Sequence, residues 1–226
     1  MVVAAGSGSR LGADVPKAFV PLAGRPLLGH ALRGALSCPG LHQVVVVAPA
    51  EWVQEAREAC RLAAAEHAQL AQHAPHLAVV AGGAERGDSV AAGLSALDAS
   101  VDIVLVHDAA RCLTPPAVFA RVVAAVEAGA VAVVPGTPVV DTVKQVDASG
   151  RVVATPDRAS LRAVQTPQGF RRDVLARAHA VSSEATDDAG LVERLGEPVI
   201  VVEGDRLALK VTTPDDLEAA TRLLVS

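Results

Sequence analysis

Short apolar runs alternate with longer helical stretches along most of this chain, and this alternation limits the folds that it can adopt. The apolar runs predict strands over residues 2–5, 44–48, 77–80, 102–106, 131–134 and 199–202. The stretches between and after them predict helices over about 26–36, 51–72, 88–98, 115–128, 171–182, 186–195 and 214–225. Such alternation is typical of a doubly wound α/β fold, in which a mainly parallel sheet carries helices on both faces.

The composition fits a sheet of this kind. Apolar residues make up 51% of the chain, but the aromatic ones are only three Phe and one Trp, so the core has to be built from Val, Ala and Leu. Such side chains suit a parallel sheet that is covered by helices. The chain has 226 residues, which is the size of one α/β domain, and we therefore expect one domain over residues 1–226.

Charge, hydropathy and cysteine content argue against several classes of protein. The formal net charge of −5 disfavours a nucleic-acid-binding protein, which usually presents a basic face. The sequence shows no charged-then-apolar leader and no apolar run that could span a bilayer, so we expect a cytoplasmic protein without membrane contact. Its three cysteines are widely spaced and predict neither a disulfide framework nor a zinc site: Cys38, Cys60 and Cys112.

Residues 137–159 break the alternation of strands and helices. Two β-rich runs flank a glycine-containing turn at 147–150, and this pattern predicts a hairpin. The hairpin has no helix to pack on, so we expect it to project from the body as an arm. Because an isolated hairpin is only marginally stable, it needs another surface, and we expect a second subunit to provide it.

The first apolar run leads into a loop of small residues between Ala4 and Gly8, and Arg10 and Lys17 follow it. Glycines let the backbone approach a ligand, and successive free N–H groups form a concave anion site. With two cations added, the stretch predicts a nucleoside triphosphate site. It is not a dinucleotide fingerprint, because Leu11 stands at the third glycine position, and it lacks the Gly-Lys-Ser/Thr of a P-loop. An ordinary strand-to-helix turn is the alternative.

A glycine pair, Gly82 and Gly83, follows a strand and precedes a helix. Exposed backbone groups at such a pair could read the edge of a nucleobase. The alternative is an ordinary helix start, with Asp88 or Ser89 as its N-cap.

The apolar run at 102–106 leads to Asp108, and ligands of open α/β sheets lie beyond strand ends of this kind. Asp108 could bind a metal or a substrate hydroxyl, and Arg111 could clamp a phosphate. The alternative is an ion pair between these two side chains. We do not select the neighbouring His107, because a histidine in such a position is more often structural.

The remaining candidates are weak when each is taken alone. The chain holds only three lysines, and each lies in or beside a candidate stretch: Lys17, Lys144 and Lys210. Lysine is a compact point charge and a frequent phosphate ligand. Lys144 could equally be solvated on the arm, and Thr186 could be the N-cap of the helix that follows it.

Taken together, these stretches resemble the 2-C-methyl-D-erythritol 4-phosphate cytidylyltransferases of the nonmevalonate isoprenoid pathway. The matching stretches fall in the family's order and span nearly the whole chain: 4–10, 16–17, 82–90, 106–111, 141–144, 166–168 and 210–212. The resemblance implies a Rossmann-like nucleotidyltransferase sheet. It also implies a homodimer in which each β-arm exchanges with its neighbour.

The resemblance implies three groups of site residues. The CTP site would be lined by Ala4, Ala5, Gly6, Gly8, Gly83 and Ser89. The triphosphate would be held, and the transition state stabilised, by Arg10, Lys17 and Lys210. Within one subunit, methylerythritol phosphate would be received by Asp108, Arg111 and Thr166. The phosphate group of this substrate would be reached by two residues on the arm of the partner subunit, Thr142 and Arg158.

The implied reaction needs no general base. Its nucleophile is a phosphate monoester, largely dianionic at neutral pH because its second pKa is about 6. Positioned cations and a Mg²⁺ ion, held mainly by the CTP phosphates, would stabilise the negative charge as pyrophosphate leaves. We expect no dedicated metal ligand in the chain. Two residues depart from the family pattern: Cys112 stands where proline is usual, and Ala84 where some members carry a polar side chain.

Other functions stay open at this point. A ribitol 5-phosphate cytidylyltransferase shares the architecture and the CTP loop and differs mainly in the alcohol phosphate, and a sugar-phosphate nucleotidyltransferase for another base is a more distant alternative. A non-catalytic nucleotide-binding regulator belongs to a different class. It is disfavoured because such a protein has no physical need for Arg10, Lys17, Asp108 and Lys210 together.

Overall fold

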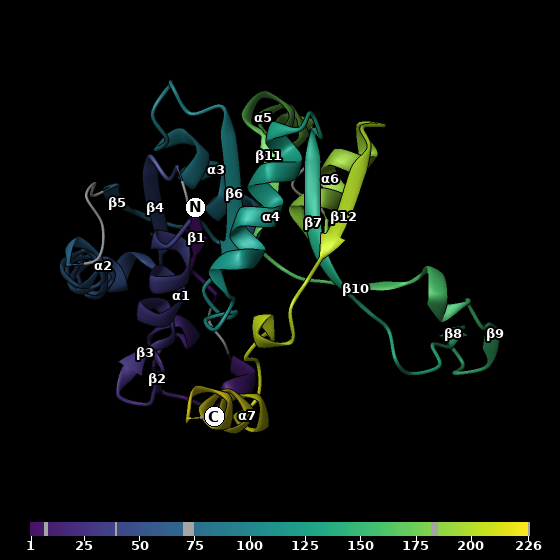
Figure 1. Cartoon of the computed structure of the whole chain (residues 1–226). Helices are drawn as coiled ribbons and strands as arrows, with labels where there is room; N and C mark the ends of the chain where they lie inside the picture. The colour runs from purple at the N-terminus through teal and green to yellow at the C-terminus, as the bar shows by residue number, and fades with distance from the viewer. Residues whose placement is uncertain (7–8, 39, 70–74, 182–184, 226) are drawn as a thin grey trace.

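The computed structural model describes residues 1–226 apart from 7–8, 39, 70–74, 182–184 and 226. Within the described residues, an eight-stranded sheet has the order β10-β7-β11-β6-β1-β4-β5, and β12 pairs with β7 (Figure 1). Pairing is parallel except at β10 and β11, so the mainly parallel α/β sheet is confirmed. Its strands are β1 Val2–Val3, β4 Gln43–Ala48, β5 His76–Ala81, β6 Ile103–Asp108, β7 Ala132–Pro138, β10 Arg162–Val164, β11 Gln168–Arg171 and β12 Val199–Glu203.

Helices cover both faces of this sheet (Figure 1). One core contains residues of α1, α2, α4 and α7, and a second contains residues of α3, α5 and α6. Alternate side chains of β4 divide between them, with Val44 and Val46 in the first core and Val45 and Val47 in the second. The sheet is therefore doubly wound. The helices are α1 Leu27–Leu36, α2 Val53–Ala68, α3 Arg86–Ser95, α4 Pro116–Glu127, α5 Arg172–Val181, α6 Asp188–Arg194 and α7 Pro214–Val225.

The helices and strands expected from the sequence are present, but several ends differ. The first strand is two residues long rather than four, because only Val2 and Val3 pair with β4 and β6. Helix α2 ends at Ala68, whereas the expected helix ran to 72; residues 70–74 lie outside the described part of the chain. A short hairpin of β2 (Pro21–Leu22) and β3 (Arg25–Pro26) precedes α1 and was not expected.

Two helices begin at other residues than expected, because a carboxylate caps each of them. Glu85 is the N-cap of α3, and it forms a capping box with Asp88. The alternative that Asp88 or Ser89 is the N-cap of this helix is therefore wrong. Helix α6 is capped by the carboxylate of Asp187 and not by Thr186.

The sequence pattern does not predict β10 and β11, which join the sheet antiparallel to their neighbours. Strand β11 lies between β6 and β7, where Gly169 faces α4. A Cβ atom on Gly169 would overlap the side chain of Val122, so only glycine fits at this point. Close packing therefore specifies β11, and no apolar run marks it in the sequence.

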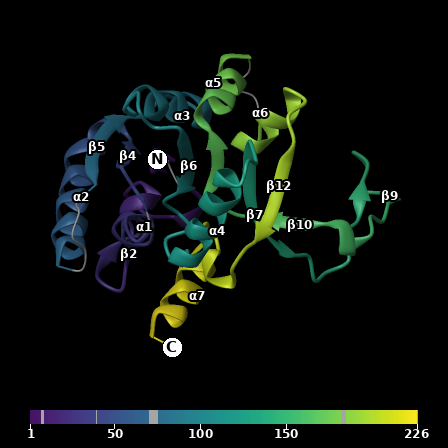
Figure 2. The same ribbon diagram turned by 45° about the horizontal axis from the view of Figure 1, so that its top comes forward.

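After Pro138 the chain leaves the sheet, and it returns at Arg162. The segment between them, residues 139–161, is called the arm below. It contains an antiparallel hairpin of β8 (Gln145–Val146) and β9 (Val152–Ala154) that is not part of the main sheet. In both views the arm projects from the body beyond β12 (Figures 1 and 2). Over the part of the chain that the structure describes, no helix has the length and apolar character needed to cross a membrane.

Candidate active site

A cavity of about 380 Å³ lies at the carboxyl ends of β1 and β6. These strands are parallel neighbours, with Val3 opposite Asp108, so the loops that follow them leave the same edge of the sheet. Strands β4 and β5 extend from β1 in one direction, while β6 lies on its other side. The cavity is thus at the switch point of the strand order, where ligands of open α/β sheets bind. Eight of the predicted site residues line it: Ala4, Ala5, Gly6, Lys17, Gly83, Ser89, Asp108 and Lys210.

The glycine pair before α3 allows the walls of the cavity to approach one another closely. A Cβ on Gly82 would lie 2.6 Å from Ser89 Oγ and 2.7 Å from the Cβ of Ala5, and a Cβ on Gly83 would overlap the side chain of Asp88. Ser89 is buried, and its hydroxyl donates to the backbone oxygen of Glu85. The expected nucleobase wall therefore consists mainly of backbone held against the opening loop.

Asp108 is the carboxylate at the centre of the cavity. Lys210 Nζ lies 2.6 Å from one of its oxygens, and Arg86 Nη2 lies 3.8 Å from the other. Burial by itself would raise the pKa of Asp108, but the positive charges of Lys210 and Arg86 outweigh it and the pKa is lowered. Asp108 is therefore ionised at neutral pH and holds the two cations beside the cavity.

Lys17 adds a further positive charge to the same wall. Burial lowers its pKa, the nearby charges of Lys210 and Arg10 lower it further, and Asp108 opposes them. Arg10 is exposed in the short helical turn Ser9–Leu11 and does not line the cavity itself. Because like charges gathered in one place repel each other, this arrangement favours an anionic ligand.

Arg111 does not pair with Asp108, so that alternative is wrong. Its Nη1 donates to Ala208 O at 2.7 Å, and its Nη2 donates to Val164 O at 3.1 Å. These bonds fasten the loop after β6 to the segment that carries Lys210. Arg111 therefore lies behind the cavity wall rather than in it, and its Nε is buried without a partner among the described residues.

Thr166 supports Asp108 from behind. Its hydroxyl oxygen accepts the Asp108 backbone N–H at 3.0 Å and lies 3.0 Å from Nδ1 of His107. Burial lowers the pKa of His107 to about 4, so its ring is neutral at neutral pH. The hydroxyl can then donate to Nδ1, and both of these bonds lie inside the protein, where Thr166 is buried. The bonds fix the backbone at the end of β6.

Arg86 is a site residue that the sequence reasoning did not select. Its Nη2 donates to Asp188 at 2.6 Å, and the other oxygen of this buried carboxylate lies 3.0 Å from His179 Nε2. Burial would raise the pKa of Asp188, but the hydrogen bond with His179 and the charge of Arg86 lower it. Arg86 is thereby held between Asp188 and Asp108. An arginine after a glycine pair and an Asp-Asp pair at a helix start were the only sequence signals.

The remaining predicted residues lie elsewhere. Thr142 and Arg158 are exposed on the arm, and Arg158 donates to the backbone oxygen of Val140 there. The structure does not bring these two residues to the cavity within one chain, because the arm projects from the body (Figure 1). Lys144 is exposed as expected and donates to Thr155. Gly8 lies outside the described residues.

The donor set suits a magnesium ion that is bound largely by a ligand's own phosphates. Among the described residues, no three His, Cys, Asp or Glu side chains gather as a metal cage. Asp108 nevertheless presents an ionised carboxylate to the cavity. Mg²⁺ is commonly held by one or two carboxylates together with substrate phosphates, and the residues present fit that pattern.

Relatives of known name match the chain over nearly its whole length. The model of the family described as 2-C-methyl-D-erythritol 4-phosphate cytidylyltransferase matches residues 1–226. A protein of this name from Nocardia farcinica is 54% identical over 224 residues, which cover 99% of this chain and 92% of the relative. Another from Saccharopolyspora erythraea is 52% identical over 228 residues, covering 99% and 97%.

Solved structures with the same activity in their names also resemble the chain. A 4-diphosphocytidyl-2C-methyl-D-erythritol synthase from Anaerococcus prevotii superposes with a TM-score of 0.84 at 26% identity, covering 100% of this chain and 96% of that one. A 2-C-methyl-D-erythritol 4-phosphate cytidylyltransferase from Thermus thermophilus gives a TM-score of 0.76 at 34% identity, with coverages of 100% and 98%. The chain belongs to the family of 2-C-methyl-D-erythritol 4-phosphate cytidylyltransferases.

Proposed function

We propose that the cavity at the ends of β1 and β6 is the active site of this cytidylyltransferase. The chain couples CTP to 2-C-methyl-D-erythritol 4-phosphate and forms 4-diphosphocytidyl-2-C-methyl-D-erythritol and pyrophosphate. The observation that carries the location is the cluster of Lys17, Lys210 and Asp108 beside glycine-rich backbone at the switch point of the sheet. Such a cavity offers both backbone and full positive charges to a triphosphate.

The reaction is a substitution at phosphorus. A phosphate oxygen of the methylerythritol phosphate attacks the α-phosphorus of CTP and forms a new P–O bond. The bond from that phosphorus to the oxygen shared with the β-phosphate breaks, and pyrophosphate leaves with the electron pair. A monoester dianion is already a nucleophile, so no residue has to remove a proton. The described residues that line the cavity accordingly include no histidine or cysteine.

Three cations are assigned to the triphosphate and to the transition state. Lys17 and Lys210 face the cavity, and Arg10 adds its charge at the outer edge. Charge that develops on the oxygens of the α-phosphate would find these groups already in place, which is the usual source of rate acceleration in such sites. Asp108 orients Lys210 through their 2.6 Å contact.

The nucleoside is assigned to the glycine-rich walls. The opening loop would contact the ribose and phosphates, and the segment before α3 would contact the cytosine. The close approach of these walls, which requires the absence of a Cβ at Gly82 beside Ala5, supports a flat ligand between them. The residues concerned are Ala4, Ala5, Gly6, Gly8, Gly83 and Ser89.

Magnesium is proposed as the cofactor. The CTP phosphates would supply most of its ligands, and the carboxylate of Asp108 would add one, which departs from the expectation of no dedicated metal ligand. When bound, the ion would neutralise phosphate charge. Removal of Mg²⁺ by a chelator is expected to abolish turnover, and full activity without a divalent ion would contradict the proposal.

The second substrate is assigned to a site shared by two subunits. Asp108, together with the Arg111 and Thr166 that support its loop, would receive the polyol phosphate from one chain. Thr142 and Arg158 would reach its phosphate from the arm of the partner. Exposed valines support a covered arm, since Val146, Val152 and Val153 are 53–58% exposed in the single chain. The edge strand β12 similarly exposes Ile200 and Val201.

Mixing two inactive variants tests this shared site. Lys17→Ala and Arg158→Ala would inactivate different halves of it. In a mixed dimer, the subunit with an intact Lys17 receives Arg158 from its partner, so about a quarter of wild-type activity is expected after random mixing in a two-fold symmetric dimer. Activity no higher than the average of the separate variants would contradict the shared site.

The substrate is tested by pyrophosphate release with CTP and each polyol phosphate. Turnover is expected with 2-C-methyl-D-erythritol 4-phosphate and not with ribitol 5-phosphate. Turnover with ribitol 5-phosphate alone would support the alternative enzyme, and none with either would support a regulator. UTP in place of CTP is the control for base recognition.

We further propose that the protein is cytoplasmic and binds neither nucleic acid nor membrane. The acidic balance of the sequence, with a formal net charge of −5, supports this. Recovery in the soluble fraction of disrupted cells is the expected result, and recovery with the membrane pellet would contradict it.

A further inference from the structure

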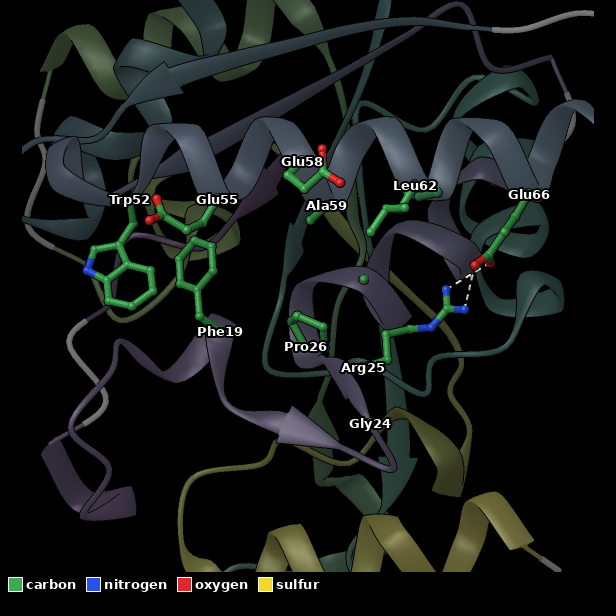
Figure 3. Close-up of a pocket in the computed structure, with 12 residues that line it drawn as sticks. Phe19, Gly24, Arg25, Pro26, Trp52, Glu55, Glu58, Ala59, Leu62 and Glu66 are labelled. Carbon is green, nitrogen blue, oxygen red and sulfur yellow. Dashed lines mark hydrogen bonds and ion pairs between the residues drawn. The ribbon is translucent and has the colours of Figure 1, made fainter.

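A second cavity, of about 480 Å³, lies on the other side of the turn that carries Lys17. One wall is formed by α2 and its N-cap Trp52, which continues at helical spacing a stripe of Glu55, Ala59, Leu62 and Glu66 (Figure 3). The opposite wall is made by Phe19 and the β2–β3 hairpin. The volume is in the range of small-molecule sites, about 300–1,000 Å³. This cavity is called the α2 groove below.

The α2 groove is closed at one end by an ion pair. Arg25 donates to both oxygens of Glu66, at 2.6 and 2.8 Å, and this bidentate pair lies at the end away from Trp52 (Figure 3). The stem of Arg25 rests against α1, since a Cβ on Gly29 would be 2.9 Å from Arg25 Cγ. The charge at this end is therefore already neutralised.

The other end of the α2 groove is aromatic and keeps a negative charge. The rings of Phe19 and Trp52 have their centroids 4.8 Å apart, and Glu55 lies beside them (Figure 3). Glu58 also lines the groove, but Arg61 binds both of its oxygens. Glu55 is the one glutamate of the groove for which the described residues provide no hydrogen bond or ion pair. Aromatic faces and a free carboxylate together attract an organic cation.

We propose that the α2 groove is a second small-molecule site, and that it binds a flat apolar molecule carrying one protonated amine. The apolar body would lie along Ala59 and Leu62, and the ammonium group would lie between Glu55 and the two rings. This site goes beyond the cytidylyltransferase reaction, neither substrate of which carries such a group.

The α2 groove is joined to the active site by a single turn. Lys17 and Ala18 line the active-site cavity, whereas Phe19, the last residue of the same turn, lines the groove. The turn is closed by the Phe19 N–H donating to Pro16 O at 2.8 Å. A ligand that shifts Phe19 as a whole is therefore expected to shift the turn that carries Lys17. This coupling rests on the role proposed for Lys17, while binding in the groove does not.

Trp52 reports binding directly, because it is the only tryptophan of the chain. The probes are phenethylamine, 2-phenylethanol and 3-phenylpropanoate, which share a ring and differ in charge. A saturable change in tryptophan emission is expected with the amine, at an affinity about fivefold or more above that of the alcohol. Equal responses to all three, or no saturable response to the amine, would overturn the proposal.

Two matched variants test whether Glu55 supplies the negative charge that attracts the amine. Glu55→Gln is expected to weaken amine binding about fivefold and to leave the alcohol unchanged. Glu58→Gln removes a carboxylate from the same helix, but one already held by Arg61, so amine affinity is expected to stay within about twofold. Equal losses in both variants would contradict the assignment to Glu55. Emission that changes with protein concentration alone would assign the groove to a second copy of the chain.

The coupling has its own readout. A saturating amine is expected to change the KM for CTP of the wild-type enzyme by about threefold or more, and not that of Glu55→Gln. Amine binding without any change in KM would refute the coupling and leave the site in place. Wild-type turnover in Lys17→Ala would refute the role of Lys17, and the emission response to the amine would be unaffected.

Discussion

The body and the arm carry the two halves of the proposed active site in different ways. In the body, Asp108 contacts Lys210 and Arg86, and Arg86 is in turn held by the buried Asp188. On the arm, Thr142 and Arg158 are exposed, and among the described residues the side chain of Arg158 donates only to the backbone oxygen of Val140. The contrast indicates that one chain preorganises the proposed triphosphate half by itself, whereas the arm half is proposed to need a partner.

The largest effect is a loss of stability, and it is expected at the buried carboxylate of Asp188 in the body. Asp188→Ala leaves Arg86 and His179 without their shared buried carboxylate and is expected to lower the free energy of unfolding by about 3–5 kcal/mol. Urea unfolding measures it. The matched control is Asp173→Ala on α5, whose carboxylate is exposed and should change stability by no more than about 0.5 kcal/mol. Equal losses in both variants would show that the buried network does not hold the body together.

The next largest effect is a loss of catalytic rate, and it is expected for Lys210 but not for another cation of the same segment. Lys210→Ala is expected to lower kcat by about 10²–10³, or 2.7–4 kcal/mol, by analogy with the loss of an oxyanion-hole donor. Lys17→Ala should behave similarly. Steady-state kinetics at saturating CTP provide the measurement. Arg206→Ala is the control, because this exposed arginine lies on the same segment outside the cavity. Near-normal turnover in either lysine variant removes that lysine from the mechanism.

A smaller effect is expected on the arm. Arg158→Ala should lower kcat/KM for the polyol phosphate by about 1.5–3 kcal/mol, the range for a hydrogen bond to a charged group. Stability should be unchanged, because the side chain is exposed. Arg151→Ala, at the hairpin turn, is the control and should retain wild-type kinetics. If Arg158→Ala unfolds more easily but turns over normally, the arm serves structure rather than substrate binding.

The smallest effect is expected at the start of α7, the helix that follows Lys210 in the chain. Asp216 forms a capping box at the start of α7, accepting from Thr212 and Thr213, and these hydrogen bonds lower its pKa to about 2. Asp216→Ala is expected to cost about 1 kcal/mol of stability. The exposed Asp215→Ala is the control.

The pH dependence of the same variant follows from the sign of the shift. Because folding lowers the pKa of Asp216, its contribution is fully present above the unfolded value of about 4 and is lost as the pH falls toward 2. Urea unfolding between pH 5 and pH 2 should therefore show a shallower loss of stability in Asp216→Ala than in the wild type. An identical slope would mean that the capping box contributes nothing in solution.

Much of the site could be predicted because its residues follow local signals. The glycine-rich loop after β1, the glycine pair before α3 and the carboxylate at the end of β6 each stand at a strand end, where the fold itself brings loops together. Eight of the predicted residues consequently line one cavity. The choice of cytidine came from the family resemblance and not from these residues' chemistry.

Other parts of the site depend on contacts between residues far apart in the chain. Arg86 and Asp188 are 102 positions apart, and Arg111 and Ala208 are 97 apart. A sequence pattern carries no record of which distant groups meet, so it left open an Asp108–Arg111 pair that the structure does not form. The same reason hides β11, whose place in the sheet depends on Gly169 packing beneath α4.

Local patterns along the chain are therefore enough to predict the doubly wound fold and the loops at the proposed active-site edge, because the periodicity of apolar residues and the glycine positions act over a few neighbouring residues. Which partner each charge takes, and where the α2 groove lies, depends instead on how distant segments pack. Those outcomes depend on burial and on hydrogen bonds that form after distant segments pack together. The physical reason is that the energy of a buried charge is set by its surroundings and not by its neighbours along the chain.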